Sequence, residues 1–148
     1  MDNISIRIAN MGDAEIILKY DHHVPEDIIS DKISRHEILI ACHDDNFAGW
    51  LRYGLFWDLV PFMNMLFLLP EYRGKGFGRQ IVQYWEKLMI EQNYKVVFTS
   101  TQQDESAQHF YNALGYGAIG GFILPDDVYE IILSKNLEAR HDCHCKPK

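Results

Sequence analysis

The stretch that most constrains this chain is "YRGKGFGRQIV", residues 72 to 82, in which Gly74, Gly76 and Gly78 alternate with cations and lead into an apolar pattern. An apolar segment ends at Pro70 just before this stretch, and helical spacing begins just after it. A helix that starts at such a loop presents free backbone N–H groups and the positive end of its dipole, and glycines let an anion come close to the backbone. The sequence therefore predicts a phosphate-binding loop, with a flexible turn carrying solvated cations as the alternative.

Two common phosphate loops do not fit these residues. A Walker loop needs Ser or Thr after its Gly-Lys, but Lys75 is followed by Gly76. A dinucleotide fingerprint starting at Gly74 needs a glycine where Arg79 stands, and the next strand ends in "TST" without an acidic residue for a ribose. The cations Arg73, Lys75 and Arg79 are then left to assist backbone N–H groups in holding an anion.

The composition limits the class of protein. The chain has 148 residues, enough for one compact domain, and its formal net charge of −7 argues against a general nucleic-acid binder. No apolar run approaches the roughly 18 to 20 residues of a membrane span, and "MDNISIRIAN" lacks the features of a secretory signal. Three cysteines, two of them close to the end, fit a reducing compartment. We therefore expect a cytoplasmic protein without nucleic-acid or membrane partners, as a monomer or a homodimer.

The periodicity of apolar residues predicts the order of the elements. Ile4, Ile6 and Ile8 alternate with polar residues as in a half-buried strand, and Gly115 can end the last helix in the left-handed conformation. The order indicates an α+β fold with a mixed, mostly antiparallel central sheet flanked by helices. One domain over residues 1–137 and a polar tail over 138–148 are expected. Strands are predicted at 4–9, 37–42, 47–56, 60–70, 95–101, 117–124 and 128–137, and helices after Asp13, after Pro25, over 78–93 and from Asp104.

Two motifs together carry a family resemblance. Arg73-x-x-Gly76-x-Gly78, between a strand and an amphipathic helix, resembles the pyrophosphate loop of the GCN5-related N-acetyltransferase (GNAT) superfamily. "AQHFYNALGY", residues 107 to 116, resembles the later motif of that superfamily, in which an aromatic-rich helix ends in Leu-Gly-Phe or Leu-Gly-Tyr. One helix and one strand separate the two motifs, as in the family, and the order of elements matches over roughly residues 3 to 137.

The resemblance implies acetyl-coenzyme A as the acyl donor and a splayed pair of strands that holds it. Backbone groups of Leu66, Phe67 and Leu68 would pair with the pantetheine arm, while the side chains of these residues serve an ordinary core strand. Asp104 stands where relatives often place an Asn that holds the donor, although it can equally be a helix cap. The implied cofactor-binding residues are Leu66, Phe67, Leu68, Arg73, Gly74, Lys75, Gly76, Phe77, Gly78 and Asp104.

The resemblance also implies direct attack of an amine in a ternary complex. Tyr111 matches the family position that protonates the departing thiolate, although helical spacing alone would make it a core residue. A backbone N–H near Leu68 is expected to polarise the thioester carbonyl. Many relatives carry a glutamate as the base, but the corresponding strands offer Asn64 and residues 99–101, "TST". An ordered water relayed by a carboxylate or histidine would replace it, and the candidates, unranked, are Asp58, Glu105, His22 and His23.

The acceptor is expected to be a small primary amine with some apolar bulk. The segment "RYGLFWDLVPF", residues 52 to 62, carries four aromatic side chains and one acid, Asp58, and ordinary core packing is the alternative for each aromatic. Arg52 can instead recognise an acceptor carboxylate. A protein amino terminus or lysine as acceptor, and an acyl-coenzyme A sensor without turnover, are the alternative functions. No metal is expected, because the tail residues His141, Cys143, His144 and Cys145 lack the spacing of common zinc sites.

Overall fold

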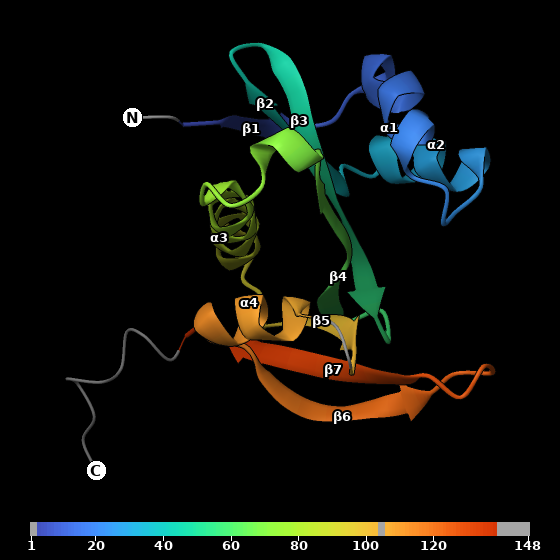
Figure 1. Ribbon diagram of the computed structural model, residues 1–148, viewed down its shortest axis with the longest axis vertical. Coiled ribbons are helices and arrows are strands. Elements are labelled where there is room, and N and C mark those ends of the chain that lie inside the picture. The colour runs from blue at the N-terminus through green and yellow to red at the C-terminus, as the bar shows by residue number, and fades with distance from the viewer. Residues whose placement is uncertain (1–2, 104–105, 139–148) are drawn as a thin grey trace. The chain divides into compact units, whose positions relative to one another are not determined.

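A strand or a helix lies at each position that the sequence predicts. The computed structural model describes residues 3–103 and 106–138 (Figure 1). Among the described helices, none is both long enough and apolar enough to cross a membrane. The elements are β1 (Ser5–Ile8), η1 (Met11–Asp13), α1 (Ala14–Tyr20), α2 (Glu26–Ser34), β2 (Ile38–His43), β3 (Asn46–Phe56), β4 (Val60–Leu68), η2 (Pro70–Tyr72), α3 (Phe77–Glu91), β5 (Val96–Gln102), α4 (Ala107–Ala113), β6 (Gly117–Ile123) and β7 (Tyr129–Asn136).

The strands form a mixed sheet in the order β1-β2-β3-β4-β5-β7-β6. Pairing is antiparallel for β1 with β2, β2 with β3, β5 with β7 and β6 with β7. The parallel ladder between β4 and β5 consists of two pairs, Phe62↔Phe98 and Met63↔Thr99. The predicted α+β class with a mixed, mostly antiparallel sheet is therefore confirmed.

The described residues divide into two compact units. One is built from the chain up to Gly54 and from Asn64 to Trp85, and the other from Leu55 to Met63 and from Glu86 onward. The predicted domain limits, 1–137 and a tail over 138–148, stay a prediction, as does the cytoplasmic location.

In the first unit, α1 and α2 lie side by side (Figure 1) and bury their apolar residues against β2 and β3. The spacing of Ile17 on α1 and of Ile29 and Ile33 on α2 places these side chains on the inner faces of their helices. Fully buried apolar side chains are worth roughly 1.5 to 3 kcal/mol each, so burial of this cluster stabilises the unit. The buried members of the cluster are Ala9, Ile17, Ile29, Ile33, Ile38, Ile40 and Trp50.

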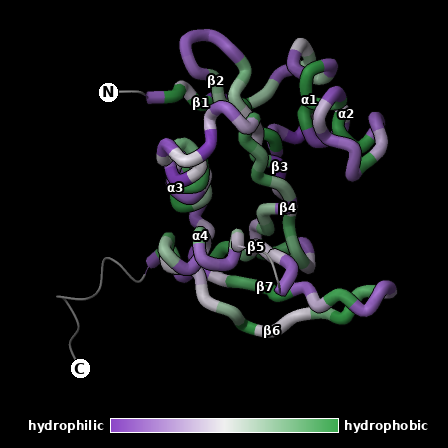
Figure 2. Tube along the Cα trace, in the orientation of Figure 1, coloured by the Kyte–Doolittle hydropathy of each residue, from purple (hydrophilic) through white to green (hydrophobic). Residues whose placement is uncertain are grey.

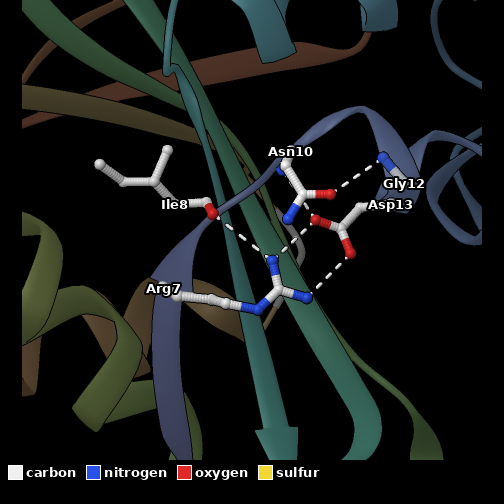
Figure 3. Close-up of polar contacts among 5 residues, drawn as sticks. All are labelled: Arg7, Ile8, Asn10, Gly12 and Asp13. Atoms are coloured by element: carbon white, nitrogen blue, oxygen red, sulfur yellow. Dashed lines mark hydrogen bonds and ion pairs between the residues drawn. The ribbon is translucent and has the colours of Figure 1, made fainter.

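Asp13 directly precedes α1, but its side chain does not cap this helix. No side-chain cap bond is made at α1, and Asp13 Oδ2 instead accepts a hydrogen bond from Asn10 N at 2.8 Å. Both carboxylate oxygens also accept from the Arg7 guanidinium, at 2.8 and 2.9 Å (Figure 3). Asn10 completes the turn, because its side-chain oxygen accepts from Gly12 N at 2.9 Å. The hydrogen bond from Arg7 lowers the pKa of the Asp13 carboxyl, and this pair ties β1 to the start of the helical segment.

A buried ion pair joins α1 to β3. Asp21 follows α1 and Arg52 lies on β3; they are 2% and 5% exposed, and Arg52 Nε donates to Asp21 Oδ2 at 3.0 Å. Burial by itself raises the pKa of the Asp21 carboxyl, but the hydrogen bonds and the charge of Arg52 outweigh it, so that the pKa is lowered overall. Arg52 is therefore a structural partner of Asp21.

Gly49 on β3 is needed because the backbone of β4 passes very close to it. A Cβ atom at Gly49 would lie 2.1 Å from Phe67 O and 3.0 Å from Leu68 Cα, and both of these are backbone atoms. Backbone atoms in a paired strand cannot move aside as the end of a side chain can. The end of β4 is thus held against β3 at a spacing that only glycine permits.

The second unit contains β5, β6, β7 and α4. The middle of β7 is hydrophobic (Figure 2), and Leu133 there is fully buried. Strand β6 is an edge strand of the sheet, and all seven of its residues are exposed. Between α4 and β6, Gly115 has a φ of 99°, as expected for the left-handed residue that follows a helix.

We predict that Gly49→Ala destabilises the protein by about 2 to 3 kcal/mol, because the added methyl group overlaps backbone atoms of β4. Urea unfolding followed by circular dichroism measures the change. The matched control is Gly117→Ala on exposed β6, where an added Cβ meets no atom within 4 Å, and we expect a change within about 0.5 kcal/mol. Equal stability of the two variants would contradict the close approach.

We predict that Asp21→Asn lowers the free energy of unfolding at pH 7 by about 3 to 5 kcal/mol, because it leaves the buried Arg52 guanidinium without its counter-charge. The lowered pKa of Asp21 stabilises the folded state above the unfolded-state pKa of about 3.9, and this contribution is lost as the pH falls through the folded-state value. The variant should therefore lose less stability than the wild type on acidification. Urea titrations at neutral and acidic pH test this, with the exposed i,i+4 partner variant Asp31→Asn as the control.

Candidate active site

The predicted phosphate loop connects β4 to α3, and its glycines are required by backbone conformation. Gly74 and Gly76 have φ values of 75° and 84°, which L-residues rarely adopt, and a Cβ atom at either position would meet no heavy atom within 4 Å. Packing therefore does not select these glycines. Their backbone stands open to a ligand, whereas Gly78 lies within the first turn of α3.

The start of α3 is anchored by Phe77, whose side chain is 1% exposed. Its ring lies 5.6 Å from the ring of His43 and 6.3 Å from that of Tyr72, measured between centroids. Gln80 N is the first helical donor, bonded to Gly76 O at 3.2 Å, so the N–H groups before it have no intrahelical acceptor. The side chain of Phe77 belongs to the core, and only its backbone can take part in the loop.

The three cations of the loop differ in their environments. Arg73 Nε donates to Leu68 O at 2.8 Å, and its guanidinium carbon lies 5.1 Å from the centroid of the Phe67 ring. Lys75 and Arg79 are exposed. Arg73 is thus fixed against the end of β4, and the other two cations extend from the loop and the first turn.

The two edges of β4 near its end can be told apart. Phe67 O lies against Gly49, and Leu69 N donates to Ala48 O at 2.8 Å, so the backbone groups of these two residues point to β3. Because backbone groups alternate along a strand, those of Leu66 and Leu68 point to the opposite edge. The bond that Leu68 O accepts from Arg73 lies on that edge. Of the three residues predicted to pair with the pantetheine arm, Leu66 and Leu68 have the suitable direction.

Tyr111 lies on α4 and is 7% exposed. Its ring makes edge contacts with the rings of Phe110 and Tyr116, with centroid distances of 5.0 and 5.6 Å. Its carbonyl oxygen accepts hydrogen bonds from Leu114 N and Tyr116 N, both at 3.0 Å. Tyr111 and Tyr116 are therefore held together by backbone and by ring contact.

One of these two tyrosines, Tyr116, is hydrogen-bonded to a buried carboxylate. Glu86 on α3 is 3% exposed; its Oε2 accepts from Tyr116 Oη at 2.7 Å and its Oε1 accepts from Lys135 Nζ at 2.9 Å. Burial and the negative charge of Glu86 raise the pKa of the Tyr116 phenol strongly, so Tyr116 stays protonated and donates this bond. This network fixes the turn that follows α4.

The residues predicted to surround the acceptor separate into three groups. Tyr53 is buried, with its ring 5.6 Å from that of Trp85, so it is a core residue, and Arg52 is held by Asp21 and not directed to an acceptor. In the second unit, the rings of Phe56 and Phe62 lie 5.8 Å apart, and Phe98 lies 5.8 Å from Phe56. Trp57 and Asp58 form the exposed hairpin tip, both with positive φ, and the Trp57 side chain is 76% exposed.

The candidate bases are scattered. His22 and His23 are exposed, and His23 Nδ1 lies 3.5 Å from Asp21 Oδ1. Asn64 is exposed on β4, and Thr99 Oγ1 donates to Met63 O at 3.0 Å. Asp104, Glu105 and the cysteines and histidines of the tail lie outside the described residues. Within residues 3–103 and 106–138, no group of three His, Cys, Asp or Glu side chains is arranged to hold a metal ion.

Strand β5 carries no carboxylate of its own, as the sequence indicates, but its neighbour β7 supplies one. Ser100 Oγ on β5 donates to Glu130 Oε2 on β7 at 2.7 Å, a contact that the sequence does not predict. The register pairs Gln102 with Glu130. The sequence signal is the apolar segment "VYEIIL", which predicts a strand but not its neighbour.

Comparison with known proteins identifies the class. Residues 10–116 match the model of the acetyltransferase (GNAT) family. Since the match covers most of the chain, the protein belongs to the acetyltransferase (GNAT) family, whose members use acetyl-coenzyme A as donor. The family, the enzyme class and the donor predicted from the two motifs are confirmed at this level.

Solved structures share the fold. A GNAT-family acetyltransferase from Bacillus cereus ATCC 10987 has a TM-score of 0.75 at 21% identity, over 90% of this chain and 97% of that one. The PaiA N-acetyltransferase from Thermoplasma acidophilum, in complex with coenzyme A, has a TM-score of 0.64 at 18% identity, over 90% and 99%. The ribosomal-protein-S18-alanine N-acetyltransferase from Escherichia coli has 0.73 at 14%, over 91% and 94%. At these identities the likeness concerns the fold alone.

Proposed function

We propose that this protein transfers the acetyl group of acetyl-coenzyme A to the primary amine of a small molecule, by direct attack in a ternary complex. The observation that carries the proposal is the loop from Arg73 to Gly78. Gly74 and Gly76 stand in open space with positive φ, directly before a helix start whose N–H groups lack helical acceptors. Such a loop suits the pyrophosphate of the donor, with charge supplied by Lys75 and Arg79.

The donor's pantetheine arm is proposed to pair with β4 through Leu66 and Leu68. Their backbone groups point away from β3, and Leu68 O is already engaged by Arg73, so the Leu68 N–H is the group left to bind the arm or the thioester carbonyl. A hydrogen-bond donor such as this N–H group stabilises the oxyanion that forms when the amine attacks. Asp104 is proposed to help hold the donor, by resemblance to the family.

Tyr111 is proposed to protonate the departing thiolate. Its ring is held by Phe110 and Tyr116, so the phenol has little freedom, and restricted geometry favours proton transfer to a fixed sulfur. Bond formation between the amine nitrogen and the carbonyl carbon breaks the C–S bond, and the thiol leaves with the Tyr111 proton. Solvent returns a proton to Tyr111 after the thiol has left.

A small acceptor is supported by the aromatic group of Phe56, Phe62 and Phe98. These half-buried rings offer a wall for an apolar amine. If protein amino termini are the acceptors instead, amine-dependent thiol release will be found with peptides and not with small amines.

We predict that wild-type protein binds acetyl-coenzyme A in calorimetric titration and that Gly76→Glu weakens this binding more than about tenfold, because it adds strain and a negative charge beside the pyrophosphate. The matched control is Gly117→Glu, the same substitution on exposed β6, which should keep the wild-type Kd. Equal Kd values for the Gly76 variant and the wild type would contradict the proposed loop. Donor binding without thiol release for any amine or peptide would favour the sensor.

We predict that Tyr111→Phe lowers kcat of thiol release by about 100-fold, because the departing thiolate loses its proton donor. The Kd for acetyl-coenzyme A should not change. The control is Tyr84→Phe, which removes a hydroxyl from an exposed tyrosine of α3. A Tyr111→Phe enzyme with wild-type kcat would show that Tyr111 is only a core residue.

A further inference from the structure

The Ser100–Glu130 hydrogen bond lies next to the place where β4 and β5 are paired. The parallel ladder consists of Phe62↔Phe98 and Met63↔Thr99, and Ser100 is the next residue of β5. On β4, the residues proposed to bind the donor's arm follow Met63 on the same strand. Glu130 thus lies beside the first residue of β5 beyond this ladder, held there by a bond of 2.7 Å.

Alternation along β5 shows which face of the sheet Glu130 occupies. Val97, Thr99 and Thr101 are buried, whereas Phe98, Ser100 and Gln102 are half-buried, so the two sets point to opposite faces. Because Gln102 and Glu130 are opposite each other in the antiparallel register, their side chains share a face with Ser100.

Helix α4 and the part of α3 that contains Glu86 pack against the other face. Lys135 and Leu133 are two residues apart on β7, so their side chains point to the same face of the sheet. Lys135 donates a hydrogen bond to Glu86 on α3. Helix α4 also contacts β5 (Figure 1). Tyr116, which follows α4, donates a hydrogen bond to the same Glu86. The Glu130 carboxylate therefore points to the side opposite Glu86 and Tyr116.

Aromatic rings stand on the face of Glu130. Phe98 is on the same face of β5 as Ser100, and the Phe62 ring lies 6.4 Å from it in an edge-to-face arrangement. On the other side of β7, Phe122 of β6 is paired with Glu130 and is 52% exposed. A carboxylate and aromatic rings on one face of a sheet are groups that attract an organic ammonium ion.

We propose that Glu130 binds the ammonium group of the acceptor and takes its proton, and that Ser100 holds the carboxylate in position. This inference rests on the proposed acetyl transfer, and it names the acceptor class as a cationic amine with an apolar or aromatic substituent. A carboxylate has about four lone-pair sites, so Glu130 can keep the Ser100 bond while accepting from an ammonium.

The proton balance of the step is complete. The acceptor R–NH3+ gives one proton to the Glu130 carboxylate, and the neutral amine attacks the thioester carbonyl carbon. The C–N bond forms and the C–S bond breaks; the sulfur takes a proton from Tyr111, and the new amide nitrogen loses one proton to solvent, which restores Tyr111. Glu130 then releases its proton to solvent, so the reaction gives an amide, a thiol and one proton.

The test is Glu130→Gln, which keeps an oxygen to accept from Ser100 but removes the charge and the basic site. With 2-phenylethylamine as acceptor we expect kcat/KM to fall about 100-fold. The Kd for acetyl-coenzyme A and the thermal midpoint should not change. Glu138→Gln is the matched control, because Glu138 is an exposed carboxylate of the same unit, paired with Lys95. Ser100→Ala should reduce kcat/KM less than Glu130→Gln, because the carboxylate remains.

A second acceptor separates this role from a structural one. Trifluoroethylamine is largely neutral at pH 7, so it needs neither an ammonium partner nor a base, and the Glu130→Gln defect should shrink to within a few-fold. A structural defect would lower kcat/KM equally for the two acceptors. Equal loss with the two amines, or kcat/KM within twofold of the wild type for 2-phenylethylamine, overturns the assignment.

If the wild type releases no thiol with any small amine, a result that would refute the proposed function, binding of the amine still tests the ammonium site. Calorimetric titration of 2-phenylethylamine into the complex with coenzyme A then gives the answer. Binding that is lost in Glu130→Gln and kept in Glu138→Gln supports the ammonium site. Binding that is equal in wild type and Glu130→Gln, or absent in both, overturns it.

Discussion

The second unit depends on one buried carboxylate, Glu86. A charge taken out of water needs partners for both of its oxygens, and Glu86 finds them in a phenol next to α4 and an ammonium on β7. Through these two hydrogen bonds, Glu86 holds α3 against the sheet and also holds Tyr116, which follows the turn at Gly115. The Tyr116 ring also contacts the Tyr111 ring. The hydrogen bond from Tyr116 to Glu86 therefore helps to fix the position of Tyr111, the side chain proposed for proton transfer.

Most of the fold could be predicted because its signals are local. The alternation of Ile4, Ile6 and Ile8, the helical spacing around Trp85, and the glycine after α4 each depend on neighbours a few residues away. The phosphate loop could also be predicted from local signals, because Gly74 and Gly76 are needed for backbone conformation and not for packing against distant residues. Helix α3 began at Phe77, one residue before the predicted start, because the buried Phe77 side chain fixes the first turn.

The residues that sequence could not place are those whose partners are remote. Ser100 and Glu130 are separated by 30 positions, and only the β5–β7 register brings them together. Arg52 was equally ambiguous, because an arginine beside an aromatic segment suits either an acceptor carboxylate or an internal acid, and Asp21 lies 31 positions before it. Strand order and register are global properties, so a charge pattern cannot be converted into ion pairs without them.

The positions of the tryptophans have a spectroscopic consequence. Trp50 and Trp85 are almost completely buried, whereas Trp57 is mostly exposed at the tip of the hairpin between β3 and β4. An exposed indole emits at longer wavelength than a buried one and is reached by aqueous quenchers. The Trp57 ring also lies 4.7 Å from that of Phe56, which borders the aromatic face of the second unit. The protein therefore carries its own fluorophore beside the surface on which amine acceptors are proposed to bind, and the other two indoles serve as an internal reference.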